Sequence, residues 1–344
     1  MFIEYCRAVL IGSLASMSSM VASAQAETLP VQVHGDFAHD KNKFALSGMD
    51  CLPEHANSRL CLVVDDELTA VQFATLSKTD TLAQYDLTVG EVVDLNLEGG
   101  EIVGKRPHKF TSMDCSGGED DGELDGEAVT HIGTTFYVVG SHGCSRKKAE
   151  YKPQSFVLSR VATEDGKAAK PVNTYQLGRA ILQSDILKSH FGKDLKGAQG
   201  GISIEGMTAG ADGESLLIAF RSPSLDKYAF LMSVKIDPLF KEGDSLSPDD
   251  IHIYPVPLGA DTGFRDIERL SDGRFLALVG SATEVSAPYM LRILAPDFSL
   301  QQETANVPAT DGGSPEAIEW LGDGRVLILS DDRQNGGAVT VSAP

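Results

Sequence analysis

The sequence lacks the features that would place the protein in a membrane or on nucleic acid. After residue 26, no stretch approaches the roughly 18 consecutive apolar residues that a membrane-spanning helix needs. Basic residues are scarce, since 29 Lys and Arg stand against 49 Asp and Glu and give a formal net charge of −20. A field of that sign repels phosphate backbones and anionic lipids. We therefore expect no nucleic-acid partner and no membrane insertion, although solubility outside the cell would explain the charge equally well.

The familiar catalytic and nucleotide-binding motifs are also absent. The sequence contains no Gly-x-Ser-x-Gly elbow, no His-Glu-x-x-His, no Walker loop and no dinucleotide fingerprint after a strand. Ser141 and His142 are adjacent, and neighbours in a strand cannot form a nucleophile–base hydrogen bond. Motifs alone therefore name no reaction for this chain.

The N-terminal sequence has the pattern of an export signal. Arg7 precedes an apolar, serine-dotted stretch over residues 8–22, and Ala24-Gln25-Ala26 supplies the small-x-small cleavage pattern. Cleavage after Ala26 would remove one acid and one base and leave the net charge at −20. We expect a signal peptide over residues 1–26, one domain over residues 27–344, and a periplasmic or secreted protein.

Only five cysteines are present, and the first would leave with the signal. The remaining four allow three pairings. Cys51 and Cys61 flank a short turn and would lie opposite each other on two hairpin strands, which leaves Cys115 to pair with Cys144 by elimination. The Cys-x-x-Cys spacings of structural zinc sites are absent. We predict two disulfides, which suit an exported protein.

One hairpin pattern occurs three times in the sequence with nearly the same spacing. Each copy is an apolar strand, an Asp-Gly turn and a second apolar strand, and the copies cover 204–221, 264–281 and 315–332. Asp-Gly between apolar runs is a strong hairpin signal, because glycine adopts positive φ at little cost. Units that recur every 50 to 60 residues favour a radial β array over a sandwich.

Further segments extend this array to an all-β fold, a β-propeller of four-stranded blades. Residues 45–66 and 125–142 fit the hairpin template more loosely, and weaker strand pairs between the hairpins supply outer strands: 70–76 with 82–88, 154–161 with 171–176, 227–236 with 250–256, and 288–294 with 298–304. The sequence predicts five to seven blades. Six is the best estimate, because residues 91–113 could form a sixth blade. Strands 29–34 and 338–341 are expected to close the ring within one blade.

One segment departs from the β pattern. Within residues 178–195, apolar residues recur at helical spacing, including Ile181, Leu187 and Phe191. The pattern predicts one inserted helix that packs its apolar face on the propeller rim.

Polar residues gather at one end of every inner hairpin. Symmetric counting about the turns makes Glu205 face Arg221, Arg265 face Ser281, and Glu316 face Asp332, and a one-residue shift would flip a side chain to the other face. In a propeller these ends ring the channel mouth. The ligand-binding or catalytic candidates there are Glu127, His142, Glu205, Arg221, Arg265, Asp266, Glu316 and Asp331. Ion pairs that fix blade register, and ordinary turn chemistry, are the alternative explanation.

An acidic loop over residues 118–125 is a second candidate site. Asp121, Glu123 and Asp125 are hard oxygen ligands of the kind that Ca²⁺ prefers. An EF-hand is excluded, because Ile132 stands where the bidentate Glu should be. A solvated acidic loop is the competing interpretation. The short basic run at residues 146–148 is interpreted as a solvated turn.

The hairpins together resemble a bacterial family known as domain of unknown function 3616. The resemblance covers about residues 124–332. The motifs that carry it are Glu127-Ala128 with 140–143, Ile204-Glu205-Gly206-Met207 with 220–223, the segment 264–267, and Glu316-Ala317. The family's pattern often runs Asp/Asn-hydrophobic-Glu-Gly, whereas this chain has Ser203 at the polar start and Ala128 at the first Gly. The resemblance implies an exported, propeller-like protein and no assigned activity.

Two functions of different class follow from these expectations. The first is an exported binding module whose acidic, arginine-lined channel mouth takes a small ligand or a partner. The alternative is a Ca²⁺-assisted hydrolase of phosphate esters or lactones, with a Glu as base. Ca²⁺ is the one cofactor that the residues suggest.

Overall fold

The computed structural model describes residues 28–39, 44–79, 84–120, 122–164, 166–196, 200–243, 246–283, 288–307 and 312–344. The expected signal peptide and the candidate ligand Asp121 lie outside these ranges. Within them, no helix is both long enough and apolar enough to cross a membrane.

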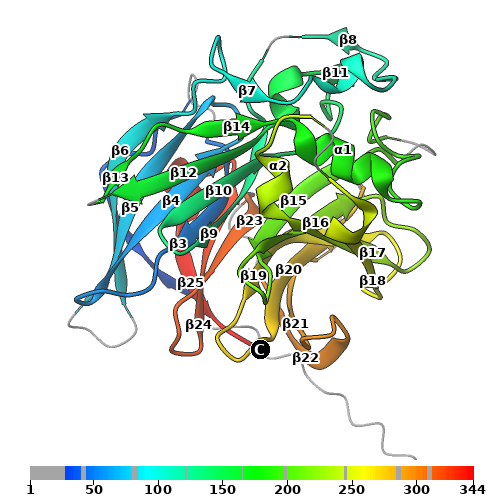
Figure 1. The fold of residues 1–344 in the computed structure, drawn as a ribbon. Coiled ribbons are helices and arrows are strands. Elements are labelled where there is room, and N and C mark those ends of the chain that lie inside the picture. The colour runs from blue at the N-terminus through cyan, green and yellow to red at the C-terminus, as the bar shows by residue number, and fades with distance from the viewer. Residues whose placement is uncertain are drawn as a thin grey trace, which may run out of the picture.

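Five sheets surround one axis and form a β-propeller (Figure 1). The apolar hairpins supply the two inner strands of each blade, with their turns at the end away from the channel mouth. The innermost strands are β3 (Leu46–Cys51), β9 (Gly126–Ile132), β15 (Ser203–Ala209), β19 (Thr262–Arg269) and β23 (Ser314–Trp320). Their antiparallel partners are β4 (Ser58–Asp65), β10 (Thr135–Gly140), β16 (Ser215–Ser222), β20 (Phe275–Ser281) and β24 (Arg325–Asp331).

The outer strands confirm the expected pairs. They are β5 (Ala70–Lys78) with β6 (Tyr85–Asp94), β12 (Leu158–Glu164) with β14 (Val172–Thr174), β17 (Ala229–Lys235) with β18 (Ile251–Val256), and β21 (Met290–Leu294) with β22 (Leu300–Asn306). The blade number is five, within the expected range but below the best estimate of six. Residues 91–94 continue β6, and β7 (Ile102–Val103) pairs in parallel with β14 at the edge of the second blade, so no sixth blade forms there.

The N-terminal strand closes the ring in two pieces. β1 (Thr28–Pro30) pairs with β25 (Val339–Ser342) and completes the last blade, as predicted. β2 (Gln32–His34) instead runs parallel to β6 on the outside of the first blade. One short stretch of chain therefore ties the first blade to the last.

The hydrophobic core lies between neighbouring blades rather than in one centre. Leu46 and Val63 of the first blade pack with Leu327 and Leu329 of the last. Leu217 and Phe264 belong to a similar cluster between the third and fourth blades. Each sheet buries both faces in this way, which explains why its strands are almost continuously apolar.

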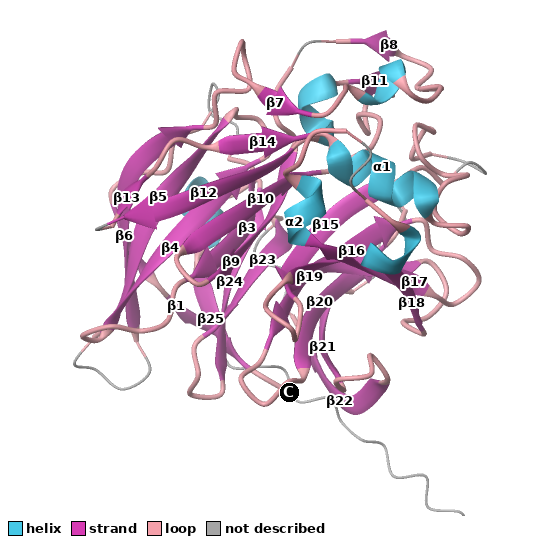
Figure 2. Cartoon of the chain, in the orientation of Figure 1, coloured by secondary structure: helices cyan, strands magenta, loops and turns pink. Residues whose placement is uncertain are grey.

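The predicted helix is shorter than expected. α1 (Gln176–Gln183) ends before Ser184, and turns continue the chain over residues 185–193. Ile181, Leu187 and Phe191 are nevertheless buried, so the apolar spacing was read correctly as a packing face and wrongly as one helix. With α2 (Ile236–Leu239), α1 lies on the side of the propeller where β7 and β11 are drawn (Figure 2).

A small cap stands over one end of the channel. The parallel pair β8 (Gly118–Glu119) and β11 (Glu150–Tyr151) joins two loops that the Cys115–Cys144 disulfide also links. The second disulfide, Cys51–Cys61, joins β3 to β4. Both disulfides are the ones predicted. The remaining short elements are β13 (Lys167–Ala168), η1 (Pro107–Lys109), η2 (Pro153–Phe156), η4 (Pro248–Asp250) and η5 (Gln334–Gly337).

Inner strands approach each other closely around the axis. A Cβ atom on Gly48 would meet the Cα of Ala128 at 2.8 Å and the carbonyl oxygen of Glu127 at 2.9 Å, both on the next inner strand. Backbone atoms cannot swing aside as a flexible side chain can.

Gly48→Ala should therefore lower the free energy of unfolding by about 1–3 kcal/mol through overpacking. Urea denaturation measures the loss. Gly122→Ala is the matched control, since its Cβ would meet only the flexible Lys152 side chain at 3.3 Å. Equal stability of Gly48→Ala and the wild type would contradict the close approach of the strands.

Candidate ligand-binding site

A β-bulge occurs at the same position of every innermost strand. The strand register skips one residue in each of the five inner pairs, and the skipped residues are Ser47, Glu127, Glu205, Arg265 and Glu316. A bulge leaves its extra residue outside the ladder and re-aims its side chain. Four ionisable side chains from four blades are thereby directed toward one axial opening.

These bulges correct the register expected from symmetric counting. Thr262, not Arg265, is the ladder partner of Ser281, and Ser314 pairs with Asp331 where Glu316 was expected opposite Asp332. Glu205 has no ladder partner either, yet its side chain still meets Arg221. Counting from the turn failed because each bulge adds one residue between the turn and the strand end.

Three of the bulge residues bring their carboxylates together at the axial opening, and we call them the carboxylate ring. One oxygen each from Glu127, Glu205 and Glu316 lies within 4.8 Å of the other two, and all three residues are buried. Like charges at such separations raise each other's pKa unless cations neutralise them.

Arginines neutralise two of the three. Arg265, only 3 % exposed, places Nη1 3.1 Å from Glu205 Oε2 and bonds Glu316 through Nη2. Arg221 Nη1 donates to Glu205 Oε1 at 2.8 Å, and Arg146 Nη2 approaches the same oxygen at 3.1 Å. The guanidinium of Arg265 also stacks 5.8 Å from the ring centre of Tyr289.

The third carboxylate, Glu127, has no such partner. Its side chain is 6 % exposed, and within the described residues no hydrogen bond or ion pair engages it. Burial, then the nearby charges of Glu205 and Asp125, raise the pKa of Glu127 well above its usual value. Burial also acts to raise the pKa of Glu205, but Arg265, Arg221 and Arg146 outweigh it and bring that pKa to about 2. The pKa values of these two adjacent carboxyls are thus displaced in opposite directions.

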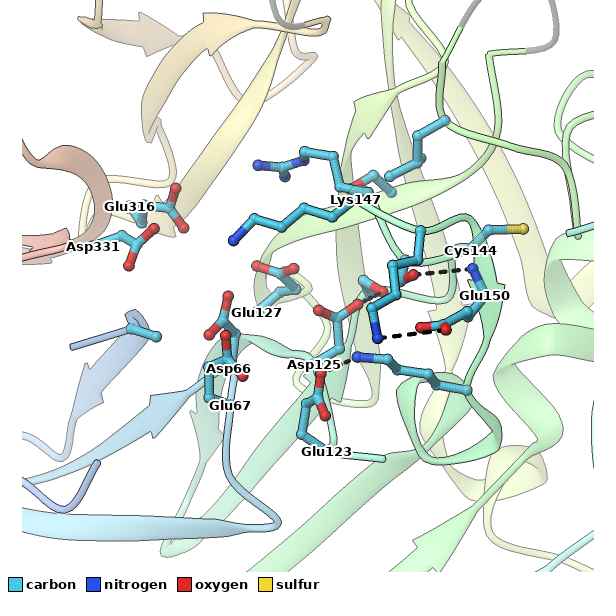
Figure 3. Close-up of a pocket in the computed structure, with 18 of the residues that line it drawn as sticks. Asp66, Glu67, Glu123, Asp125, Glu127, Cys144, Lys147, Glu150, Glu316 and Asp331 are labelled. Carbon is cyan, nitrogen blue, oxygen red and sulfur yellow. Dashed lines mark hydrogen bonds and ion pairs between the residues drawn. The ribbon is translucent and has the colours of Figure 1, made fainter. Parts of the chain in front are cut away.

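The carboxylate ring opens into a cavity of about 670 Å³ (Figure 3). Among the described residues, ten acidic and four basic ones line it. Asp66 follows β4 and Asp331 ends β24, while the basic residues come from the cap loop between β10 and β11 and its continuation at Lys152. Burial raises the pKa of both Asp66 and Asp331, with neighbouring acids adding to the effect. The cavity therefore holds excess negative charge that its own side chains do not fully neutralise.

The structure brings most of the predicted residues together, but not all. Glu127, Glu205, Arg221, Arg265 and Glu316 form the charged ring, and Asp331 lines the cavity beside it.

His142 and Asp266 lie elsewhere. His142 is fully buried against Phe156, its Nδ1 lies 3.0 Å from the Gly140 carbonyl oxygen, and burial lowers its pKa to about 4. Asp266 accepts hydrogen bonds from the backbone of Ile267 and, at 2.8 Å, from Ile318 on the next inner strand. Both residues serve the framework of the blades. His142 directly follows Ser141, which lines the cavity, and Asp266 directly follows the bulge residue Arg265.

The acidic loop contributes two of its three candidate ligands to the cavity. Glu123 and Asp125 line the same cavity, but Glu123 pairs with Lys152 and Asp125 accepts a hydrogen bond from Ser141. Asp121 lies outside the described residues.

The sequence reasoning missed Asp66, Arg146 and Lys147. The basic run at residues 146–148 was interpreted as a solvated turn, yet it lines the cavity and Arg146 reaches Glu205. The available signal was its position two residues after Cys144, whose disulfide with Cys115 anchors the loop.

Comparisons with known proteins add no functional assignment. No family model and no curated protein matches the chain. A calcium-binding regucalcin from Agrobacterium tumefaciens strain C58 is 10 % identical over 91 % of this chain and 95 % of its own, with a TM-score of 0.38. A periplasmic gluconolactonase of Pseudomonas aeruginosa is 13 % identical over 84 % of this chain and 65 % of its own, with a TM-score of 0.37.

A third structure, a protein of unknown function from Bacteroides caccae, is 13 % identical over 59 % of this chain, with a TM-score of 0.28. The match spans about half of that protein's length, 52 %. Likenesses of this size support no argument about activity, and the propeller assignment rests on the five sheets themselves.

Proposed function

We propose that this protein is an exported binding module whose channel mouth takes a small ligand with a cationic group or a bound divalent cation. The observation that carries the proposal is Glu127, a buried carboxyl that has no hydrogen-bond or ion-pair partner among the described residues. It lines a cavity that Glu316 also lines, and it lies beside a third buried carboxylate, Glu205. A buried polar group that lacks a partner is costly, and a bound cation would remove that cost.

The donor set fits a hard cation such as Ca²⁺. Glu127 and Glu316, with Asp66 and Asp331 nearby, offer carboxylate oxygens from three different blades, and Ca²⁺ prefers such ligands. Glu205 is less available, because three arginines already neutralise it. Its role in the proposal is to hold Arg265, which spans Glu205 and Glu316 and keeps the carboxylates apart.

The two disulfides favour the exported part of the proposal, since such bonds persist in oxidising compartments. Membership of the domain of unknown function 3616 family is also part of the proposal. The short sequence motifs that carry this resemblance contain the bulge residues Glu127, Glu205, Arg265 and Glu316.

A second function, metal-assisted hydrolysis of phosphate esters or lactones, is favoured by one observation. Glu127 and Glu205 are adjacent carboxyls with pKa values displaced in opposite directions, as in an acid–base pair. A bound Ca²⁺ would supply Lewis-acid chemistry, while Glu127 would hold the transferable proton. A panel of esterase, lactonase and phosphatase substrates, with and without EDTA, would detect such turnover.

Glu127→Gln should weaken Ca²⁺ binding at least tenfold, because it replaces an anionic ligand with a neutral amide of the same shape. Isothermal titration of the metal-free protein with CaCl₂ measures the affinity. Glu164→Gln, at an exposed residue outside the cavity, is the control. A wild type that binds no divalent cation, or a Glu127→Gln variant that binds it normally, would refute the cation site.

A further inference from the structure

The cavity is electrically divided between two walls. The acidic wall belongs to the first and last blades, where Asp66 and Glu67 follow β4 and Asp331 and Asp332 lie at the end of β24. The opposite wall is the cap loop, which carries Arg146, Lys147 and Lys148 in succession and one acid, Glu150, that pairs with Lys148. A cation alone would use only the first wall.

The cap loop is held in place rather than free to collapse onto the acids. Its first residue, Cys144, is bonded to Cys115. Within the loop, Ser145 N donates to the Glu150 carbonyl at 2.8 Å, Ala149 N donates to the Ser145 carbonyl at 2.8 Å, and Glu150 N donates to Ser145 Oγ at 3.0 Å. These bonds fix the backbone from which the three basic side chains project.

The three basic residues are not equivalent. Arg146 is bonded to Glu205, and Lys148 lies 3.6 Å from Glu150. Lys147 has no hydrogen bond or ion pair among the described residues, although its side chain is exposed and reaches over the cavity toward Glu127, Glu316 and Asp331 (Figure 3). An ammonium group held above carboxylates can serve as a mobile counter-ion that moves away when a stronger cation arrives.

We propose that the cavity binds an oxyanion-bearing small molecule, a phosphate ester or a carboxylate, together with a divalent cation. The carboxylates of Glu127 and Glu316 hold the cation. The oxyanion lies above it and is bound by the Lys147 ammonium and the Arg146 guanidinium, both of which line the cavity. This inference rests on the proposed function and names the second half of the ligand. Cation and oxyanion neutralise each other between the two walls, so each binds more tightly when the other is present.

Titration calorimetry with methylphosphonate and with acetate, each with and without saturating CaCl₂, tests this inference on the full mature chain. We expect Ca²⁺ to tighten binding of at least one of the two anions, and the tighter one identifies the class of oxyanion. Lys147→Gln should weaken that binding about tenfold, the usual weight of one charge-assisted hydrogen bond. In the absence of the anion, the same variant should bind Ca²⁺ more tightly than the wild type, because it lacks the ammonium group that competes with the cation. Lys170→Gln, at an exposed residue outside the cavity, should change nothing.

The failures of the two proposals can be told apart. A wild type that binds Ca²⁺, but binds both anions no better with it than without, would overturn the inference and leave the cation site standing. Unchanged anion affinity in Lys147→Gln would do the same. A wild type that binds neither Ca²⁺ nor either anion would overturn the proposed function itself.

Discussion

Replacing Arg265 with methionine should destabilise the protein by about 3–5 kcal/mol at neutral pH, the usual cost of removing one partner from a buried ion pair. Arg265 is 3 % exposed and bonds both Glu205 and Glu316. Its loss would leave Glu316 without the arginine that neutralises it, and Glu205 with two of its three arginines. Methionine fills a similar volume, which separates the electrostatic loss from a packing loss. Urea denaturation at pH 7 measures the effect.

Arg269→Met is the matched control, because Arg269 lies on the same strand and is exposed. It should change stability by no more than about 0.5 kcal/mol, as surface substitutions usually do. Part of the Arg265→Met loss should return at pH 5, where protonation relieves the unpaired carboxylates. A variant as stable as the wild type at pH 7 would show that the ring does not depend on this guanidinium.

Stability should fall as the pH rises from about 4 to 7. Burial raises the pKa of Asp65 from 3.8 to about 6, and the pKa values of Asp66, Glu127, Glu268 and Glu319 lie well above normal, chiefly through burial. Such groups bind protons more tightly in the folded protein than in the unfolded chain. Their stabilisation is therefore complete below the unfolded pKa and is lost as the pH rises through the folded one.

Asp65 alone should account for about 2 kcal/mol of this loss between pH 4 and 6. Glu205 has the opposite sign, since a folded pKa near 2 gives stability that is present above pH 4.5 and lost toward pH 2. Its contribution is constant across the range where the raised carboxyls titrate, so they set the slope there.

Urea denaturation at half-unit pH intervals measures this slope, and Asp65→Asn should flatten it between pH 4 and 6. Asp249→Asn, at an exposed residue, is the control. Saturating Ca²⁺ should also reduce the slope above pH 6, because it stabilises the ionised form of Glu127. Stability that rises steadily from pH 4 to 7 would contradict the raised pKa values.

The propeller was predictable because its signals are local. Asp-Gly turns between apolar runs predict hairpins, and each turn needs only its own residues to form. The outer strands, the ring closure by β1 and β25, and both disulfides followed from the same short-range reasoning. The helix over 178–195 and the sixth blade over 91–113 were wrong where apolar spacing was short enough to fit more than one element.

The site was predictable as a set of residues but not as a geometry. Glu127, Glu205, Arg265 and Glu316 stood out as charged residues on apolar strands. That each lies in a bulge could not be read from the turn, because a bulge depends on the hydrogen bonding between two strands. His142 and Asp266 stood out in the same way, and their side chains serve the backbone instead.

From its sequence alone the protein acquires its hairpins, its excess of acid and its paired cysteines, since propensity, charge and cysteine count act over a few residues or over the whole composition. Only the tertiary structure decides that Arg265 lies between two glutamates, that Glu127 has no partner in the described part of the chain, and that Lys147 reaches across the cavity from a disulfide-held loop. These relations join residues from different blades. They arise because closing the ring brings together side chains that no local interaction relates.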